Sequence, residues 1–394
     1  MRRNQLFTCA LLFCVSPICA DEKLETSTPK QIDVAKAQFA RFGAKYQESR
    51  DWYTRKLIPT FLLPKETSDD DLNDLPNLPF CFGLHLNDTQ VTDKGLANLQ
   101  PLQNLFELQL HRTKVSGAGL RALGGLKHLQ RLRVSRTKVT DADLKDLQAL
   151  RNLTHLDLQA LPITGQGLKC LQPLKKLEYL ALSHTRISPE GFRNLKYLKN
   201  VNGVSLSYPE VTDEVVTALS EVDRLQVLTL AAARRGRRPA SLEEVVRLAF
   251  HGTRIGDRGL KEFRMCKNVE IFQLGFTKVT EEGLKHLVGM KKLQTLTLNK
   301  LPVTDKGLDY LKNCKGLRLL ILADTQITDV GLKKLQYFPE LTHVYLSSTK
   351  VTDKGLQELK SLTKLRVLDV QGTAVTEAGI TALEEALPKC RIQH

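Results

Sequence analysis

Apolar and polar positions recur along this chain with a period of about 24 residues, from Cys81 to the C-terminus. The first third of each repeat alternates apolar and polar residues, which is the period of a half-buried strand. The second half places apolar residues at i, i+3 and i+6, as at Leu356, Leu359 and Leu362, which is typical of a short helix. Each repeat is therefore predicted to be a strand, a turn and a helix, and the stacked repeats a solenoid.

The repeats, called rows and named by their first residue, keep one register to the end of the chain. Rows start at residues 81, 105, 129, 153, 177, 201, 225, 245, 269, 293, 317, 341 and 365, and the row at 225 is short. A typical helix opens with Thr-Asp-x-Gly-Leu, as at residues 352–356, where the threonine is a predicted N-cap and the aspartate lies near the positive end of the helix dipole. We attribute the glycine to close approach of neighbouring coils, where a Cβ would collide. Because the rows repeat this motif, we interpret it as structural.

The row pattern, LxxLxLxxTxVTDxGLxxLxxLxx, resembles the leucine-rich repeat family, and within it the bacterial 24-residue type with a Thr-Asp-x-Gly-Leu helix start. The resemblance covers residues 81–394. It implies an α/β solenoid with a curved parallel β-ladder on the concave face and helices on the convex face. The rows are also similar to the repeats of cysteine-containing F-box adaptors, but the chain shows no convincing F-box. Members of this family generally act as interaction modules, so the resemblance implies binding and leaves the ligand open.

The two ends and the middle depart from the repeat. Residues 1–20 are predicted to be a cleaved secretory signal, with Arg2 and Arg3 ahead of a short apolar run and Ala20 at the cleavage site. Export follows, to the periplasm, the cell envelope or the medium. A membrane anchor is the alternative, although the run is about half of the roughly 20 residues that a span needs. The remaining predicted boundaries are a helical N-terminal cap at 21–56, a degenerate first repeat at 57–80, regular rows at 81–224 and 245–388, a shortened row at 225–244 and a C-terminal cap at 389–394.

Two features predict the N-terminal cap. Thr28 and Gln31 have the spacing of a capping box, with Pro29 at the first helical position. Four aromatic residues fall on one helical stripe: Phe39, Phe42, Tyr46 and Tyr53. Since the first coil of a solenoid has an exposed apolar edge, this helix is expected to cover it. A helix that binds a partner is the alternative.

The chain is basic, with a formal charge of +15 at pH 7. Such a charge suggests anionic partners, such as acidic proteins or envelope polymers. The lysines, however, are scattered over the polar helix-side positions of many rows, which is typical of a solvated outer surface. We therefore interpret most of the charge as surface solvation.

Five cysteines remain beyond the predicted signal: Cys81, Cys170, Cys266, Cys314 and Cys390. Cys266 and Cys314 fall on the same core position two rows apart, too far for a disulfide at about 4.8 Å per stacked strand. We interpret them as buried apolar thiols. No metal site is predicted, because no His or second Cys lies at zinc-ligand spacing.

The shortened row at 225–244 carries a basic loop with four arginines in five positions: Arg234, Arg235, Arg237 and Arg238. The missing residues are assigned to the turn and helix, which predicts a notch on the convex side with the loop in it. Guanidinium groups pair bidentately with phosphates and carboxylates, so the loop is a candidate site for an anionic polymer. A mobile solvated loop left by a partial deletion is the alternative.

The third, fifth and seventh residues of each row are predicted to point out of the concave face. The N-terminal rows give a polar and basic strip, with candidate binding residues Glu107, Gln109, His111, Arg131, Arg133, His155, Asp157 and Tyr179. The C-terminal rows are less polar at these positions and at the strand ends, with candidates Ile271, Phe276, Leu319, Ile321, His343 and Tyr345. Exposed apolar residues in a row on a sheet suggest a protein partner.

The sequence shows no arrangement that indicates catalysis: no nucleophile with a base, paired carboxylates in a cleft, metal cluster or phosphate loop stands out. We predict no catalytic residue, no cofactor, and no membrane span after signal cleavage. The favoured function is an exported, non-enzymatic protein that binds a protein or an envelope polymer on its concave face. Two alternatives stay open: a polyanion binder that uses the basic loop with Arg131 and Arg133, and a structural spacer of the envelope.

Overall fold

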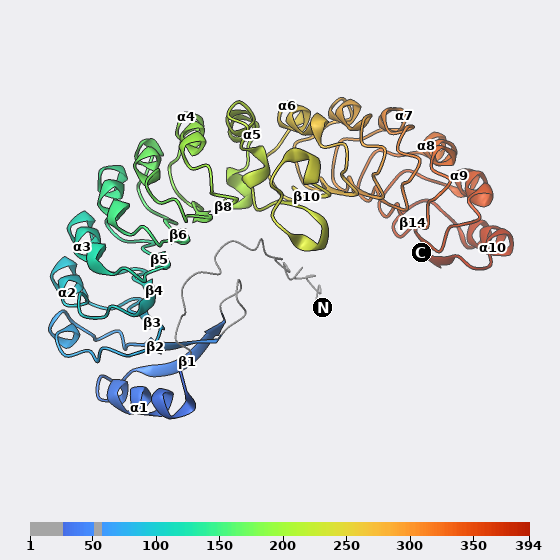
Figure 1. The fold of residues 1–394 in the computed structure, drawn as a ribbon. Coiled ribbons are helices and arrows are strands. Elements are labelled where there is room, and N and C mark those ends of the chain that lie inside the picture. Colours follow the sequence, from blue (N-terminus) through green and yellow to red (C-terminus); the bar gives the residue numbers. More distant parts are fainter. Residues whose placement is uncertain (1–26, 51–56) are drawn as a thin grey trace.

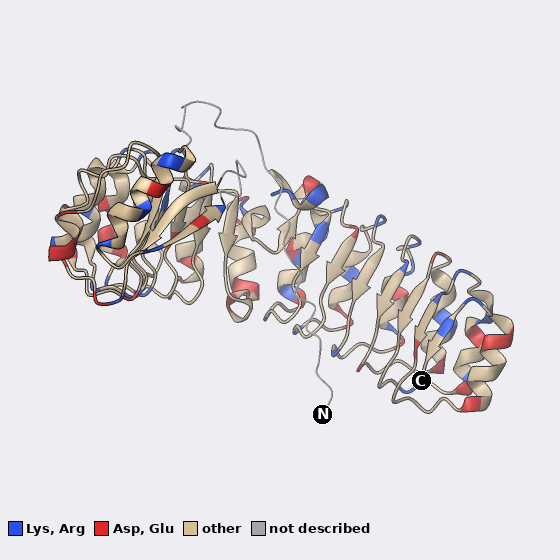
Figure 2. Ribbon diagram, turned by 90° about the horizontal axis from the view of Figure 1, so that it is seen from below, with Lys and Arg blue, Asp and Glu red and all other residues tan. Residues whose placement is uncertain are grey.

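The computed structural model describes residues 27–50 and 57–394, so the predicted signal peptide lies outside the described residues. The strands line the inner side of an arc and the helices line its outer side (Figure 1). The predicted α/β solenoid, with a parallel ladder on the concave face and helices on the convex face, is confirmed. Basic and acidic residues are both distributed along the whole ribbon (Figure 2).

The ladder is split into two eight-stranded sheets within the described residues, where one continuous ladder was predicted. Apart from β1 and β9, neighbouring strands pair in parallel and one row apart, so that Leu319 faces His343 and Ile321 faces Tyr345. The first sheet contains β1 (Lys45–Arg50), β2 (Leu57–Leu62), β3 (Phe82–His85), β4 (Leu105–Gln109), β5 (Arg131–Arg133), β6 (His155–Asp157), β7 (Tyr179–Ala181) and β8 (Gly203–Ser205). The second contains β9 (Ala231–Ala232), β10 (Arg247–Ala249), β11 (Ile271–Gln273), β12 (Thr295–Thr297), β13 (Leu319–Ile321), β14 (His343–Tyr345), β15 (Val367–Asp369) and β16 (Arg391–Gln393).

The helices are short, as predicted from the apolar residues at i, i+3 and i+6 in each row. The α-helices are α1 (Pro29–Ala40), α2 (Asp93–Ala97), α3 (Gly117–Ala122), α4 (Pro189–Arg193), α5 (Asp213–Ser220), α6 (Asp257–Glu262), α7 (Gly307–Tyr310), α8 (Asp329–Lys334), α9 (Asp353–Leu356) and α10 (Glu377–Ala386). In three rows a 3-10 helix takes the place of the α-helix, at Asp141–Ala149, Gln166–Leu171 and Gly283–Leu287. Further 3-10 turns lie at Asp70–Leu72, Leu123–Gly125, Asn194–Tyr197, Tyr208–Glu210, Leu225–Val227, Arg234–Gly236, Leu242–Glu244, Phe263–Met265, Leu335–Tyr337 and Gln357–Ser361.

One apolar core runs between the strands and the helices for the length of the arc. It consists mainly of the repeated leucines, which no single row could bury alone. The ninth residue of a typical row is a buried or partly buried threonine whose hydroxyl bonds the carbonyl oxygen three residues earlier, as Thr349 does to Leu346 at 2.6 Å. The residue before it often has a left-handed backbone, as at Ser348 with φ 57°. This turn leads the chain from the concave to the convex side.

A carboxylate between neighbouring coils explains the Thr-Asp-x-Gly-Leu motif. The Asp329 carboxylate accepts two hydrogen bonds from the next row, from the Thr352 backbone N–H and from its hydroxyl, each at 2.8 Å. A Cβ at Gly355 would lie only 2.3 Å from Asp329 Oδ1. The prediction that the glycine permits close approach of coils is confirmed, and its neighbour is the aspartate of the preceding row.

Rows 105 and 129 show the same arrangement with the two residues exchanged. Gly117 stands where other rows have the aspartate, and Asp143 stands where the next row has the glycine. Asp143 Oδ2 accepts from the N–H and the hydroxyl of Thr140 at 2.9 and 2.8 Å, and a Cβ at Gly117 would lie 2.0 Å from Asp143 Oδ1. The interface therefore has room for one carboxylate, which either row can supply.

The N-terminal cap is a helix followed by a β-hairpin, so the helical prediction for residues 21–56 is wrong for part of this range. Helix α1 begins with the predicted capping box of Thr28 and Gln31 and ends at Ala40, and Gly43 then turns the chain with φ 68°. Tyr46 lies on β1, which pairs antiparallel with β2. A strand is favoured here because it satisfies the backbone groups at the edge of the sheet.

Helix α1 nevertheless covers the first coil. Phe39 stacks on Phe61 with ring centroids 4.0 Å apart, and Phe61 packs edge-on against Phe82 at 6.3 Å. All three rings are buried. Tyr53 of the predicted aromatic stripe lies outside the described residues. At the other end, β16 adds one more parallel strand to β15, so the segment 389–394 extends the ladder.

The shortened row leaves the convex side altogether, so the convex notch was a wrong prediction. Helices α5 and α6 stack directly across it: the Gly256 N–H donates to Asp213 Oδ1 at 2.6 Å, and the Arg254 N–H donates to the Val211 carbonyl at 3.0 Å. Without a turn and helix of its own, the segment folds back as β9, antiparallel to β10. The basic loop consequently projects to the inner side of the arc (Figure 1, yellow, beside β10).

We expect that the aspartate and the glycine can also be exchanged between two other neighbouring rows, as they are at Gly117 and Asp143. Asp329→Gly removes the acceptor of two hydrogen bonds and should lower the free energy of unfolding by about 2 kcal/mol. Gly355→Asp places two carboxylates in one site and should cost at least as much. The double variant restores one carboxylate and should recover at least half of the summed loss, measured by urea unfolding. Additive losses would contradict the one-carboxylate interface.

Candidate binding surfaces of the concave face

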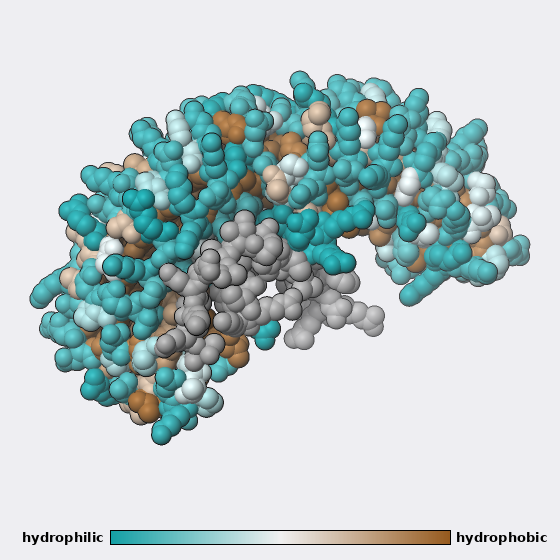
Figure 3. Space-filling model, in the orientation of Figure 1, coloured by the Kyte–Doolittle hydropathy of each residue, from teal (hydrophilic) through white to brown (hydrophobic). Residues whose placement is uncertain are grey.

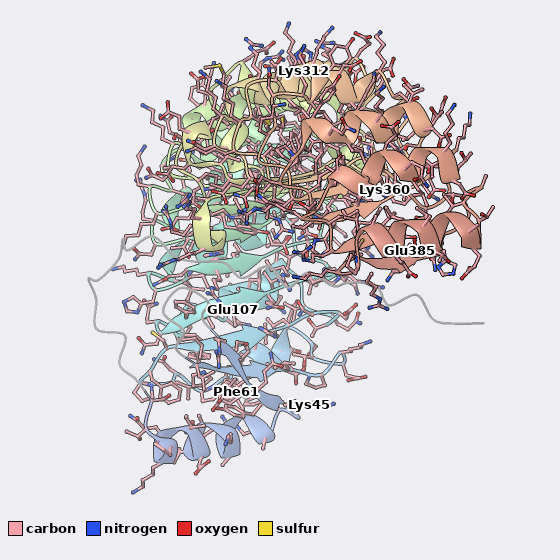
Figure 4. All side chains as sticks on the ribbon, turned by 90° about the vertical axis from the view of Figure 1, so that its right-hand side faces the viewer. Lys45, Phe61, Glu107, Lys312, Lys360 and Glu385 are labelled. Atoms are coloured by element: carbon pink, nitrogen blue, oxygen red, sulfur yellow. The ribbon has the colours of Figure 1, made fainter. Side chains whose placement is uncertain are left out.

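The N-terminal strip is a network of partnered side chains centred on Glu107, which Figure 4 labels on the strands of the first sheet. Glu107 is buried, and its Oε1 lies 3.1 Å from His85 Nε2 and accepts from Gln109 Nε2 at 2.6 Å. The Arg131 guanidinium lies 3.6 Å from the other carboxylate oxygen. The register of β3, β4 and β5 places these residues side by side.

This environment fixes the ionisation of Glu107. Burial alone would raise the pKa of the carboxyl group, but hydrogen bonds from His85 and Gln109 and the charge of Arg131 outweigh it and lower the pKa to about 2. Glu107 therefore stays ionised in the folded protein and balances the positive charge of Arg131.

Arg133 is balanced in the same way. Its Nε lies 2.9 Å from Asp157 Oδ2, and its guanidinium also donates to Gln109 Oε1 at 3.3 Å. The Arg131 guanidinium lies over the Phe106 ring at 5.4 Å. The sequence identified these polar residues, but it did not show that their acids and bases pair. The strip is consequently far less basic than its arginine content suggests.

His155 and Tyr179 continue the column of Glu107 and Arg131 onto β6 and β7, and His111 follows the end of β4. His155 and Tyr179 stack with ring centroids 5.6 Å apart. His111 Nδ1 lies 2.9 Å from the Ser135 hydroxyl. Burial lowers the pKa of His111, and the charges of nearby arginines lower it further against the opposing effect of Asp88. His111 therefore favours its neutral form within the network.

The C-terminal strands carry an apolar patch, which we define as Ile271, Leu319, Ile321, His343, Tyr345 and Val367. Leu319, His343 and Val367 follow one another in one column of the sheet, and Ile321 and Tyr345 in the next. All six side chains are partly exposed. Val367 was missed by the sequence analysis, although it occupies the third position of row 365. The outer surface visible in Figure 3 is mainly hydrophilic with separate hydrophobic areas.

Phe276 lies away from this patch, at the flank of the solenoid where the strand has ended. Its backbone is left-handed, with φ 60°, and its side chain is 46% exposed. The His251 ring packs edge-on against it at 4.8 Å, and Lys300 Nζ lies 5.1 Å from the ring centroid. The structure therefore separates Phe276 from the other apolar candidates.

The basic loop reaches the first sheet through Arg238, which lies near Gly203 of β8 and Tyr179 of β7. Arg234 pairs with Glu270 at 3.0 Å, and Arg237 lies 3.9 Å from Glu244. Burial lowers the pKa of Arg238 to about 10, and its Nε is only 3.5 Å from where a Cβ on Gly203 would be. Arg235 is exposed. The four arginines thus differ in environment, and the loop separates the N-terminal strip from the apolar patch.

Two adjacent rows, residues 313–335 and 339–360, match the family model described as Leucine Rich repeat. These two rows are leucine-rich repeats, and the chain has the fold of a leucine-rich repeat solenoid. Its fold is similar to that of an internalin from Listeria monocytogenes, at 16% identity and a TM-score of 0.51, with 92% of this chain and 94% of the internalin covered. It is also similar to TLR13 in the structure of a TLR13–ssRNA13 complex, at 18% identity and a TM-score of 0.51, with 85% of this chain and 52% of that one covered.

A weaker likeness is to a leucine-rich repeat protein from Leptospira interrogans, at 19% identity and a TM-score of 0.40, with 84% of this chain and 75% of that chain covered. No curated protein matches the chain significantly by sequence. At their identities, the likenesses to the internalin and to TLR13 show the fold alone.

The cysteines of the described residues are all free. Cys266 and Cys314 are buried, which confirms the prediction of apolar thiols, and burial raises the pKa of Cys266 to about 12 and of Cys314 to about 11.

Within residues 27–50 and 57–394, no group of three or more His, Cys, Asp or Glu is placed to hold a metal ion. The helices of this part of the chain are all too short or too polar to cross a membrane.

The buried position of Glu107 predicts a pH-dependent contribution to stability. Its folded pKa of about 2 lies below the ordinary 4.5, so the contribution is full above pH 4.5 and is lost as the pH falls toward 2. Glu107→Gln should therefore be less stable at pH 7 by about 3 kcal/mol, and this difference should close between pH 4.5 and 2. Urea unfolding at several pH values measures it.

The control is the exposed Glu66→Gln, whose unfolding curve should follow that of the parent protein at every pH. A difference between Glu107→Gln and the parent that stays constant down to pH 2.5 would contradict the network.

Proposed function

We propose that this leucine-rich repeat solenoid is a non-enzymatic binding module whose concave face takes a protein partner. The apolar patch is the observation that carries this proposal. Leu319, Ile321, His343, Tyr345 and Val367 stand in register on the neighbouring strands β13, β14 and β15 and remain partly exposed. Ile271 extends their line on β11, beyond Thr295 of β12. Apolar side chains of this kind gain about 25 cal/mol per Å² when a partner removes them from water.

The N-terminal strip around Glu107, called the polar strip from here on, also suits a protein partner. Because Glu107, Arg131, Arg133 and Asp157 pair with one another, the strip offers a preorganised hydrogen-bonding surface of low net charge. Interfaces commonly combine an apolar centre with a polar surround. The two surfaces on one arc therefore favour a large partner that contacts both sheets.

Export is part of the proposal and rests on the residue pattern at 1–20. The membership in the bacterial 24-residue type likewise rests on the Thr-Asp-x-Gly-Leu rows. A second candidate function is binding of an anionic polymer through the basic loop, which is supported by the exposure of Arg234 and Arg235 on the concave side. The pairing of Arg131 and Arg133 with acids weakens that candidate.

Acidic substitutions in the apolar patch test the proposal. Ile321→Asp and Tyr345→Asp should each lower capture of the protein partner at least tenfold in pull-downs with the chain from residue 21, because a charge would be buried in the interface. Val330→Asp is the matched control, since Val330 is 60% exposed on α8 at the convex side. Its capture should equal that of the parent protein.

The salt dependence of partner capture distinguishes the two candidate functions. Capture by an apolar interface should hardly change between low and high salt, whereas a polyanion complex weakens by roughly one power of salt per phosphate contacted. Capture that is salt-labile and lost on replacing the four loop arginines by alanine would favour the polymer. Equal capture by Ile321→Asp, Tyr345→Asp and Val330→Asp would refute the concave protein site.

A further inference from the structure

The direct stacking of rows 201 and 245 brings together residues that the sequence keeps far apart. The backbone of Thr212 bridges to Arg254, and the Arg254 N–H donates to the Val211 carbonyl. At the flank, where the strands end, Gly252 lies next to Tyr208, whose Cδ2 is 3.9 Å from the position of a Cβ on Gly252. On its other side, the Gly252 N–H donates to the Gly275 carbonyl at 3.0 Å, beside Phe276.

Gly252 is the eighth residue of its row, and the fold does not require glycine at this position. Its φ is 75°, but the same position of other rows has φ between 54° and 61° with side chains present, including Arg112, His184, Phe276 and Lys300. A Cβ on Gly252 would meet nothing closer than the Tyr208 ring atom at 3.9 Å. The missing side chain therefore leaves a gap in a column of side chains along the flank.

Two exposed aromatic rings stand on either side of this gap. Tyr208 is 54% exposed and Phe276 is 46% exposed. Two row steps separate their backbones, which is roughly 10 Å. Phe276 contacts His251, the residue before Gly252, at 4.8 Å and Lys300 of the following row at 5.1 Å. Exposed aromatic rings that are fixed by their neighbours are typical anchors of binding sites.

Basic side chains predominate around the gap, although Glu214 lies close enough to Lys278 to interact with it electrostatically. Arg186, Arg254, Lys278 and Lys300 are exposed, and none of them makes an ion pair with another residue that the structure describes. The acid nearest to the gap in the sequence, Glu210, already accepts hydrogen bonds from Ser207 N–H and hydroxyl and from the His184 N–H. The gap is therefore an apolar site within a basic surround.

The basic surround is short. The corresponding flank positions in row 153 are Ala160 and Pro162, and row 293 has Pro302 at its tenth position. The basic area thus extends over four row steps, from Arg186 in row 177 to Lys300 in row 293, which is roughly 20 Å at 4.8 Å per step. An extended segment of about six residues covers this length at ~3.3 Å per residue. Such a bounded area, with a single gap between aromatic rings, favours a short acidic segment over a long polymer.

We propose that the gap over Gly252, between Tyr208 and Phe276, binds one aromatic or proline side chain of an acidic protein segment. This proposal rests on the protein-binding role given above and places a second contact of the partner at the flank. The ring inserts between the two aromatic residues, and the flanking carboxylates face Arg186, Arg254, Lys278 and Lys300.

Two fluorescein-labelled peptides test the site with the intact chain. One has three glutamates on each side of a central phenylalanine, and the other has alanine at the centre. In fluorescence anisotropy the phenylalanine peptide should bind about tenfold tighter, because the alanine peptide keeps the charge and loses the ring. Tyr208→Ala should reduce this preference to less than twofold.

Filling the gap is the sharper variant. Gly252→Phe introduces a side chain that the same position carries in the next row, and it should abolish the preference for the phenylalanine peptide. Gly372→Phe is the matched control, because Gly372 has the same row position and a φ of 67°. Both variants carry the same backbone strain, so only the blocked gap distinguishes them. Gly372→Phe should keep the tenfold preference.

Several results would overturn the site. The two peptides could bind equally well, or neither could bind. Gly252→Phe and Gly372→Phe could change the preference equally. A six-nucleotide oligothymidylate could bind more tightly than the phenylalanine peptide. Ile321→Asp should leave peptide binding unchanged. Failure of the peptide assay would therefore leave the concave site intact, and loss of capture by Ile321→Asp would still be seen.

Discussion

A single carboxylate between neighbouring coils is the constraint on which the rest of this solenoid depends. The Asp353 carboxylate accepts from both the N–H and the hydroxyl of Thr376, and these hydrogen bonds lower the pKa of Asp353. The glycine of the next helix exists because the carboxylate occupies the place of its side chain. Where row 177 has Pro189 instead of the aspartate, row 201 has Val215 instead of the glycine. A change in one row is thus tied to a change in the next.

The same interaction explains how the arc passes the shortened row. Asp213 bonds the Gly256 N–H and lies 2.4 Å from where a Cβ on Gly259 would be, so it joins rows 201 and 245 as if they were consecutive. The helices therefore stack without interruption while the sheet is split. Residues 225–244 have no place on the convex side and fill the concave side, where Arg238 packs near Gly203. The break in the sheet follows from continuity of the helical side.

The features that recur in each row could be predicted from the sequence. The features that depend on which rows contact one another could not. The period, the core, the capping box at Thr28 and the reason for the glycines follow from local patterns, which is why they were correct. The side on which the basic loop projects depends on the contact between α5 and α6, which no row contains. The pairing of Glu107 with His85 and Arg131 needs the register of three strands. Tyr208 and Phe276, 68 residues apart in the chain, flank one gap only because a row is skipped.

Skipping a row on one side of the solenoid also arranges the candidate surfaces. The polar strip and the apolar patch lie on separate sheets, the basic loop lies between them, and the aromatic gap lies at the flank of the same junction. Because one core and one stack of helices join both sheets, these surfaces are held in a fixed relation. A partner that binds the apolar patch raises the effective concentration of its own acidic segment at the flank. Two weak contacts on such a rigid arc can therefore combine into one strong interaction.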